Sequence, residues 1–187
     1  MERKSYKMTI AGLERELPLC ELNDDLYIAA FVIFGDPELT EAAATEMLKK
    51  APEYDCLITA ESKGIPITYE MARQRGDKKY FLARKSPKLY MTEVFSVDVD
   101  SITTAGIQKL YMDKLEAAQI KGKRILIVDD VISTGNSLNA LTCLVEAAGG
   151  EIVGCMSILA EGDAIDRDDI IYLEKLPLFR PDGTEIW

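Results

Sequence analysis

The chain has 187 residues, the size of one ordinary domain, and its 48% hydrophobic and 29% charged residues exclude a disordered or fibrous protein. The net charge of −10 repels polyanions, so we expect no binding to nucleic acid or to anionic membranes, whereas a small phosphorylated ligand stays compatible with it. Because the sequence contains no histidine, Ser/His/Asp catalysis, Cys/His catalysis and histidine-containing metal sites are excluded.

The cysteines favour a reducing compartment. The sequence has four cysteines, at Cys20, Cys56, Cys143 and Cys155. They form no CxxC pair and stand among apolar residues, which predicts buried free thiols rather than disulfides or a zinc site. The first residues lack the apolar stretch of a signal peptide, and the apolar run 26–34 is too short to span a bilayer. We therefore expect a cytoplasmic protein without a membrane segment.

The N-terminal part predicts an antiparallel or edge element followed by a helix. Strands are expected at Tyr6–Ile10, Glu14–Leu19 and Tyr27–Phe34. Asp36, Pro37 and Glu38 then supply an N-cap, a proline at the first helical position and an acidic first turn. Apolar residues at helical spacing follow, so a helix is expected over about 37–50.

From residue 56 onward the pattern alternates between strands and helices, as in α/β proteins. Strands are predicted at Cys56–Ala60, Tyr80–Arg84, Arg124–Asp129 and Ile152–Leu159. Helices are predicted at Pro66–Arg75, ended by Gly76, and at Asn136–Ala148, ended by Gly149 and Gly150. The continuous apolar run 125–128 is typical of a strand covered on both faces, so the central sheet should be mostly parallel.

Residues 86–108 interrupt this alternation and predict a long hairpin or a mobile loop. The tail predicts a last strand over 170–173 and an apolar arm over 176–179. Because neither an internal repeat nor a low-complexity linker divides the sequence, we expect a single domain over residues 1–187.

The segment 124–138 carries the clearest chemical signal. A buried strand ends in Asp129 and Asp130, and the turn Ser133-Thr134-Gly135-Asn136-Ser137 then opens a helix. Ligands of open α/β sheets bind beyond the carboxyl ends of the strands, where a helix N-terminus offers free N–H groups to a phosphate. The two carboxylates are acceptors suited to vicinal hydroxyls, as on a ribose. This pattern indicates a sugar phosphate.

Three other interpretations compete with this one. A receiver domain is disfavoured because too little chain follows Asp130 to complete such a fold. A Walker-B aspartate is disfavoured because no GxxxxGK[ST] loop lies upstream. The third is a merely capped turn, which would be the better interpretation of STGNS alone, but its place after a buried strand and two aspartates favours the ligand site.

At these residues the sequence resembles type I phosphoribosyltransferases. The stretch 128–137 is similar to their motif for 5-phosphoribosyl 1-pyrophosphate (PRPP). The resemblance implies that Asp129 and Asp130 hold the ribose 2- and 3-hydroxyls. It also implies that the loop Ser133, Thr134, Gly135, Asn136 and Ser137 binds the 5-phosphate. The usual motif has Gly where Asn136 stands, and asparagine is expected to tolerate a left-handed backbone there.

Two further stretches resemble the adenine branch of this family. Ser62, Lys63 and Gly64 look like its pyrophosphate loop, with Lys63 as a cation that acts in catalysis. The basic stretch that follows the next strand implies further PRPP contacts from Arg84, Lys85 and Lys88. The alternatives are an ordinary helix entry for the first stretch and a solvated basic face for the second.

Less specific resemblances concern the flexible loop and the base. The adenine enzymes carry an acidic residue in their flexible loop, and Asp100 is our candidate for a catalytic role here, with Asp98 as the second choice. The base would lie between Val131 and an apolar residue of a small hood, for which Tyr27 and Ile28 are the candidates and Phe31 the reserve. Their spacing also fits ordinary core residues.

The resemblance implies a type I phosphoribosyltransferase fold, a mostly parallel sheet flanked by helices, with a hood formed by residues 1–35 and about 170–187. It implies transfer of the 5-phosphoribosyl group from PRPP to a purine, with adenine favoured because Ser133 stands where hypoxanthine-guanine enzymes have Asp. Mg²⁺ bound mainly through PRPP, without protein ligands, and a homodimer are also implied. The alternatives are a PRPP-sensing regulator of the same fold and a xanthine- or hypoxanthine-specific enzyme. Orotate is disfavoured because the basic loop of that branch contains histidine.

Overall fold

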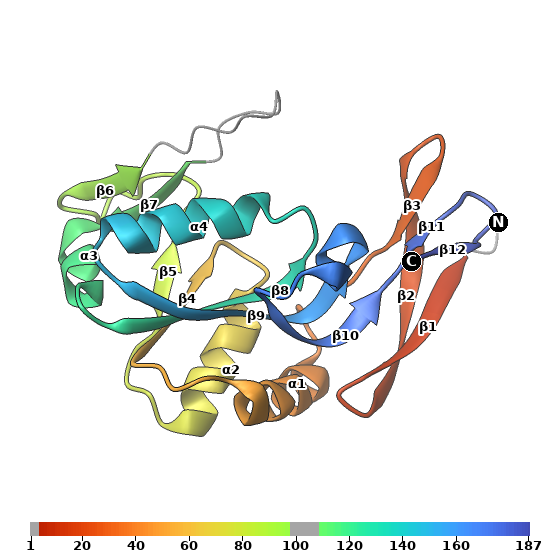
Figure 1. Ribbon diagram of the computed structural model, residues 1–187, viewed down its shortest axis with the longest axis horizontal. Helices are drawn as coiled ribbons and strands as arrows, with labels where there is room; N and C mark the ends of the chain where they lie inside the picture. Colours follow the sequence, from red (N-terminus) through yellow and green to blue (C-terminus); the bar gives the residue numbers. More distant parts are fainter. Residues whose placement is uncertain (1–3, 98–108) are drawn as a thin grey trace.

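The computed structural model describes residues 4–97 and 109–187 (Figure 1). Within these residues, a five-stranded parallel sheet forms the centre of the molecule. Its strands lie in the order β10 (Ile171–Leu176), β9 (Glu151–Glu161), β8 (Arg124–Ile132), β4 (Cys56–Ala60) and β5 (Phe81–Ala83). The expected parallel sheet is confirmed.

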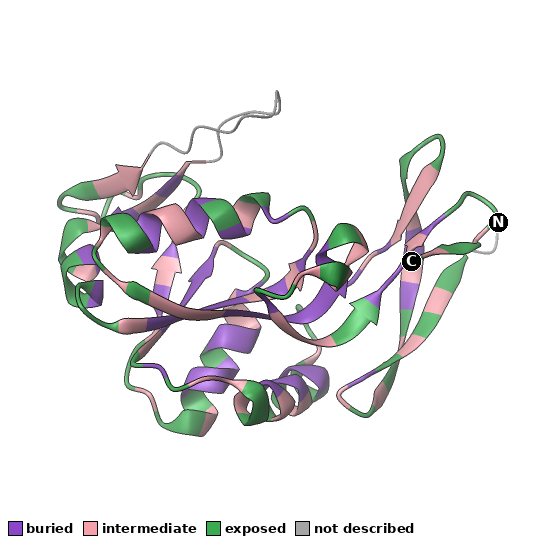
Figure 2. Ribbon diagram, in the orientation of Figure 1, coloured by how far each residue is buried: buried purple, intermediate pink, exposed green. Residues whose placement is uncertain are grey.

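Helices cover both faces of this sheet (Figure 1). One face carries α1 (Pro37–Lys50) and α2 (Ile65–Arg75), and the other carries α4 (Asn136–Ala147). Strand β8 contributes side chains to the cores on both faces of the sheet, because successive side chains of a strand point to opposite faces. Leu126 and Val128 belong to the core beneath α1 and α2, whereas Ile125 and Ile127 belong to the core beneath α4. Figure 2 shows this buried layer through the middle of the molecule.

A second sheet forms the hood at one end of the molecule (Figure 1). It joins the first and last parts of the chain in antiparallel order: β1 (Ser5–Ile10), β2 (Leu13–Asn23), β3 (Leu26–Ala29), β11 (Leu178–Phe179) and β12 (Glu185–Ile186). Ile10 and Phe179 are fully buried in the same core cluster as α1. The hood therefore shares a core with the central sheet, as expected of a hood built from both ends of the chain.

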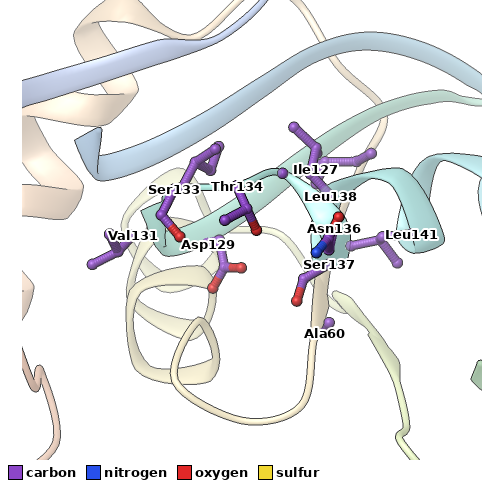
Figure 3. A pocket seen from close by; sticks show the side chains of 12 residues that line it. Ala60, Ile127, Asp129, Val131, Ser133, Thr134, Asn136, Ser137, Leu138 and Leu141 are labelled. Carbon is purple, nitrogen blue, oxygen red and sulfur yellow. The ribbon is translucent and has the colours of Figure 1, made fainter. Parts of the chain in front are cut away.

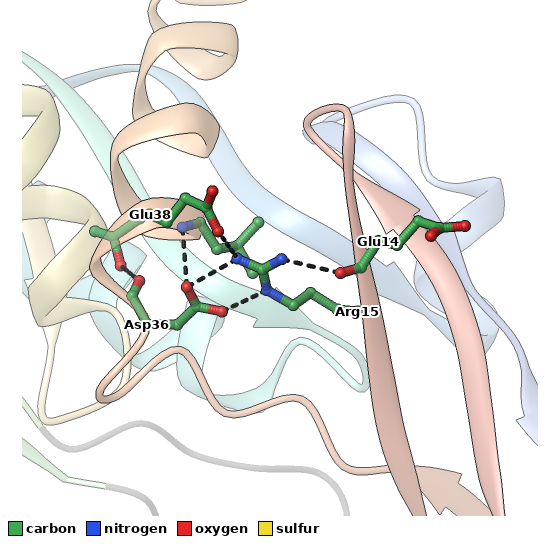
Figure 4. A network of polar contacts seen from close by, with 6 residues as sticks. Glu14, Arg15, Asp36 and Glu38 are labelled. Atoms are coloured by element: carbon green, nitrogen blue, oxygen red, sulfur yellow. Dashed lines mark hydrogen bonds and ion pairs between the residues drawn. The ribbon is translucent and has the colours of Figure 1, made fainter.

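An ionic cluster also joins the hood to the first helix (Figure 4). Arg15 of β2 binds Asp36 through Nε at 2.6 Å and Glu38 through Nη2 at 2.9 Å. Asp36 is at the same time the N-cap of α1, where its side chain accepts a hydrogen bond from the Leu39 amide at 3.0 Å. The start of α1 and the hood are therefore held by one carboxylate.

One strand of a hairpin lies in the segment 86–108, which was predicted as a long hairpin or a mobile loop, and its partner strand lies just beyond that segment. β6 (Val94–Val97) pairs with β7 (Leu110–Asp113) in antiparallel register, and Arg84 forms a bridge to Tyr111 beside it. A short 3-10 helix, η1 (Gly162–Asp166), follows β9. No helix within the described ranges combines the length and the apolar character needed to cross a membrane.

The structure corrects the sequence predictions at several places. The strand expected over Tyr27–Phe34 ends at Ala29; the alternation continues because Phe31 and Ile33 are buried where the chain crosses from the hood to α1. Helix α3 (Lys114–Ile120) was not predicted, although Asp113 caps it through the Leu115 amide. None of the four cysteines forms a disulfide, but only Cys155 is buried.

Candidate active site

The acidic pair, Asp129 and Asp130, lies near the carboxyl end of β8, beside the end of β4. Asp130 is 2% exposed, and its Oδ2 accepts no hydrogen bond from any described residue. Lys63 Nζ lies 3.2 Å from this atom as an ion pair, while half of the lysine side chain stays exposed. A buried carboxylate oxygen with unused hydrogen-bonding capacity at the mouth of a site is suited to a ligand donor such as a hydroxyl.

The surroundings of Asp129 favour its neutral form. Burial raises the pKa of Asp129, and the neighbouring negative charge of Asp130 raises it further, against a smaller opposing effect of Lys63. The Asp130 amide donates a hydrogen bond of 2.9 Å to Asp129 Oδ1, which holds this side chain in place. Hydrogen bonds from the hydroxyl groups of a ligand would therefore stabilise the ionised form of Asp129.

A turn of five residues, the 133–137 loop, leads from β8 into α4. Gly135 takes the left-handed conformation, with φ of 79°, and Asn136 is already the first residue of the helix. The tolerance of asparagine for a left-handed backbone is therefore not needed at position 136. A cavity of about 70 Å³ lies inside this turn, and Figure 3 shows Asp129, Ser133, Thr134 and Ser137 around it.

The 61–64 loop, which leads from β4 into α2, approaches the acidic pair closely. A Cβ atom on Gly64 would lie 2.2 Å from Thr59 Oγ1 and 2.9 Å from Asp129 Oδ1. Only glycine fits between β4 and the first carboxylate, so the two loops meet at this residue. The peptide bond between Glu61 and Ser62 is cis. Ser62 and Lys63 are exposed at the tip of the loop.

Glu61 connects this loop to the basic stretch after β5. Its carboxylate binds Arg84 Nη1 at 3.0 Å, the Lys85 amide at 2.9 Å and Lys88 Nζ at 3.4 Å. The side chains of Arg84 and Lys88, which follow β5, are therefore held beside the 61–64 loop, which follows β4. Although burial raises the pKa of Glu61, these donors outweigh it, and the pKa is lowered overall.

Comparison with known proteins agrees with this geometry. The sequence profile of the phosphoribosyl transferase domain matches residues 36–176, most of the chain. The chain belongs to the phosphoribosyltransferase family. A hypoxanthine/guanine phosphoribosyltransferase of Methanococcus voltae is 34% identical over 154 residues, covering 82% of this chain and 78% of its own. An orotate phosphoribosyltransferase of Caldanaerobacter subterraneus is 28% identical over 149 residues and covers 79% of this chain, which spans only 64% of that relative.

The fold is that of a type I phosphoribosyltransferase. The crystal structure of an adenine phosphoribosyltransferase from Thermoanaerobacter pseudethanolicus is similar, with a TM-score of 0.61 and 26% identity. The match covers 76% of this chain and 84% of that one. The three relatives carry the names of three different base specificities, so the family and the transferase class are shared while the base is not decided by similarity.

In this phosphoribosyltransferase the predicted base-binding residues do not share one surface. Tyr27 and Val131 both pack at the edge of the same core cluster, on the side of α1. Ile28 follows Tyr27 in β3 and therefore points to the opposite face of the hood. Phe31 is buried in the core. The role of all four in base binding stays a prediction, and Asp98 and Asp100 lie outside the described residues.

Two charged residues near the site were not predicted. Glu161 ends β9, and burial raises the pKa of its carboxyl while nearby Lys63 lowers it. Arg167 follows η1 and reaches Gly135 in the 133–137 loop. The position of Glu161 at the end of a predicted parallel strand was a usable signal, because such strand ends meet at one edge. Nothing local in the sequence marks Arg167.

Proposed function

We propose that this phosphoribosyltransferase transfers the 5-phosphoribosyl group of PRPP to a purine base, with adenine favoured, giving a nucleoside 5-monophosphate and pyrophosphate. The observation that carries the proposal is the meeting of three groups at one sheet edge. These are the acidic pair, the helix-capping 133–137 loop and Lys63 on the 61–64 loop, whose Nζ lies 3.2 Å from Asp130.

Ribose and phosphate would be held by the two sides of the β8–α4 turn. The hydroxyls at ribose carbons 2 and 3 would donate to Asp129 and Asp130, where Oδ2 of Asp130 is buried and open to a donor. The 5-phosphate would accept hydrogen bonds from the amides and hydroxyls of residues 133–137 at the start of α4. Held at both ends, the ribose ring presents C1 to the base in a fixed orientation.

In the proposed reaction a nitrogen of the base attacks C1 and the bond from C1 to pyrophosphate breaks, through a transition state with oxocarbenium character. The proton of the base N–H group is released to solvent or to the leaving pyrophosphate. The leaving pyrophosphate takes the bonding electron pair, so its growing charge needs cations. Lys63 would supply one, and Arg84 and Lys88, gathered beside the 61–64 loop by Glu61, would supply others. These residues act by position and charge, without a protein nucleophile.

A magnesium ion is part of this proposal. The described residues contain no group of three or more Cys, Asp or Glu side chains arranged around one point, so the ion would be held mainly by pyrophosphate oxygens. When bound, it would neutralise the phosphate charge. A cytoplasmic location and a homodimer complete the proposal.

Adenine is favoured over other purines on two grounds. Ser133 stands in the loop where hypoxanthine-guanine enzymes carry an aspartate, and the similar crystal structure from T. pseudethanolicus is of an adenine enzyme. A xanthine- or hypoxanthine-specific transferase is the second candidate, because the relative from M. voltae bears the hypoxanthine/guanine name at 34% identity.

The test is pyrophosphate release from PRPP and Mg²⁺ with adenine, hypoxanthine, guanine, xanthine, uracil and orotate offered separately. We expect turnover with adenine and its loss in an Asp129→Asn/Asp130→Asn variant. Turnover with another purine alone would move the assignment to the second candidate. Tight binding of PRPP without turnover on any base would replace the enzyme by a PRPP-sensing regulator.

A further inference from the structure

Arg167 places its guanidinium against Gly135 of the 133–137 loop, next to the residues that line the cavity inside that loop. A Cβ atom built on Gly135 would lie 2.5 Å from Arg167 Nη1 and 3.7 Å from Cζ. Glycine at this position therefore does two things: it allows a φ of 79°, and it leaves room for the guanidinium. The contact joins residues 32 positions apart, through β9 and η1.

The loop itself brings no cation. The sequence contains neither Lys nor Arg between Arg124 and Arg167, so β8, the loop and α4 supply only amides, hydroxyls and the two carboxylates. A phosphate monoester carries close to two negative charges at neutral pH, and the acidic pair beside the loop repels it. Lys63 belongs to the other loop, 61–64, where its Nζ lies 3.2 Å from Asp130. Arg167 is a basic side chain that the fold brings to this loop.

Asp169 sets the direction of this guanidinium. Its carboxylate accepts from Nε at 2.8 Å and from Nη2 at 2.6 Å, a two-point pair that occupies one edge of the planar group. Nη1 is left outside this pair, on the side of Gly135. The Arg167 side chain is 29% exposed, so it is partly shielded from water and still reachable by a ligand.

We propose that Arg167 is a binding residue for the 5-phosphate of PRPP, held in orientation by Asp169. This inference rests on the proposed function, because it assumes that a sugar phosphate occupies the 133–137 loop. It assigns the 5-phosphate a charged donor besides the backbone amides. It also separates the two anionic ends of PRPP, since Arg167 serves the 5-phosphate while Lys63 serves the pyrophosphate.

The test measures binding of ribose 5-phosphate and of pyrophosphate with Mg²⁺ separately, by calorimetry, to the wild-type protein and to Arg167→Ala. We expect Arg167→Ala to weaken ribose 5-phosphate roughly 10- to 100-fold, the range of one charge-assisted hydrogen bond, and to leave pyrophosphate unchanged. Lys123→Ala is the matched control: it also removes one positive charge but lies just before β8, at the opposite end of the strand, and should change neither ligand.

Two outcomes would overturn the proposal: unchanged ribose 5-phosphate binding in Arg167→Ala, or an equal loss of both ligands, which indicates general damage. If Arg167→Ala fails to fold, Arg167→Lys decides. It keeps the charge but loses the two-point pair with Asp169, so we expect a smaller, selective loss for ribose 5-phosphate, and an unchanged affinity would contradict the proposal.

The binding measurements need no base. Together with the turnover assay, they distinguish failure of the Arg167 assignment from failure of the proposed transferase reaction. A protein that turns over no base but loses ribose 5-phosphate selectively in Arg167→Ala retains the Arg167 assignment and disproves the transferase reaction. A protein that turns over adenine with unchanged PRPP KM in Arg167→Ala keeps the reaction and disproves the Arg167 assignment.

Discussion

Asp129 and Asp55 are two aspartates whose surroundings move their pKa values in opposite directions. Burial and the neighbouring Asp130 raise the pKa of Asp129. Hydrogen bonds from the Arg124 side chain and amide lower the pKa of Asp55 to about 2. The ionised form of the first aspartate lowers the stability of the folded state, whereas the second aspartate stabilises the fold by holding the start of β8 next to the start of β4.

Asp129→Asn should therefore raise the free energy of unfolding, and more so at high pH. The folded protein binds the Asp129 proton more tightly than the unfolded chain, so ionisation at pH above about 4 costs stability increasingly until the folded-state pKa is passed. Asparagine keeps the acceptor for the Asp130 amide and removes the charge. We expect a gain of about 1 kcal/mol or more at pH 8 and little change at pH 4, measured by urea unfolding.

Asp55→Asn is the opposite control. A folded-state pKa of about 2 contributes stability above about pH 4 that is lost as the pH falls toward 2. We expect this variant to be less stable than the wild type at pH 7 and similar to it near pH 2. Equal signs for the two variants at pH 8 would contradict the assignment of the buried charge to Asp129.

Gly64→Ala tests the close approach of the two loops. The added Cβ would lie 2.2 Å from Thr59 Oγ1 and 2.9 Å from Asp129 Oδ1, and Thr59 is fully buried. We expect a loss of about 1–3 kcal/mol in stability and weaker PRPP binding, because the carboxylate must move. Adding Thr59→Ala should restore part of the stability, since it removes the nearest atom; strictly additive losses in the double variant would rule out this clash.

At the scale of elements, the hood is joined to α1 by one shared carboxylate. Asp36 accepts from Arg15 of β2 and from the Leu39 amide of α1, so it serves a tertiary ion pair and a helix cap together (Figure 4). The hydrogen bonds from Arg15 lower the pKa of Asp36. Glu38, the other partner of Arg15, is 71% exposed and should contribute little.

We expect the order of destabilisation Asp36→Ala, then Arg15→Ala, then Glu38→Ala. Arg15→Ala should cost about 1 kcal/mol, and Asp36→Ala about 1 kcal/mol more because the cap is also lost. Hydrogen exchange should accelerate in β1 and β2 for Arg15→Ala, and additionally in the first turn of α1 for Asp36→Ala. Equal exchange at the start of α1 in both variants would show that Asp36 does not act as the cap.

At the scale of the whole molecule, the two proposed anion-binding sites stand on a chain of net charge −10. Such a protein selects phosphates through local groups rather than through its overall field. Lys63, Arg84 and Lys88 on one side, and Arg167 on the other, are each held by a carboxylate neighbour. Positive charge is therefore available at the proposed site, although the net charge of the chain is negative.

PRPP with Mg²⁺ should raise the midpoint of thermal unfolding. A ligand at 100 times its Kd stabilises the folded state by about 2.7 kcal/mol, because it binds the native protein alone. The rise should vanish in Asp129→Asn/Asp130→Asn, and a DNA duplex should produce none in the wild type. Scanning fluorimetry at several PRPP concentrations measures this, and a rise that persists in the double variant would place PRPP elsewhere.

The sequence by itself determined the parallel sheet, the acidic pair and the two loops that follow β4 and β8. Each of these features depends on a local pattern of about ten residues, such as an apolar run, a helix start, a glycine or a pair of carboxylates. The start of α3 was equally local, since Asp113 precedes Glu116 by three residues, and could have been predicted.

Only the tertiary structure decided which distant residues meet. Glu61 gathers Arg84 and Lys88, Gly64 lies against Asp129, and Arg167 reaches Gly135. The physical reason is that such contacts depend on the path of the chain between the partners and on where β9, η1 and the hood pack, and no local pattern of residue types records this.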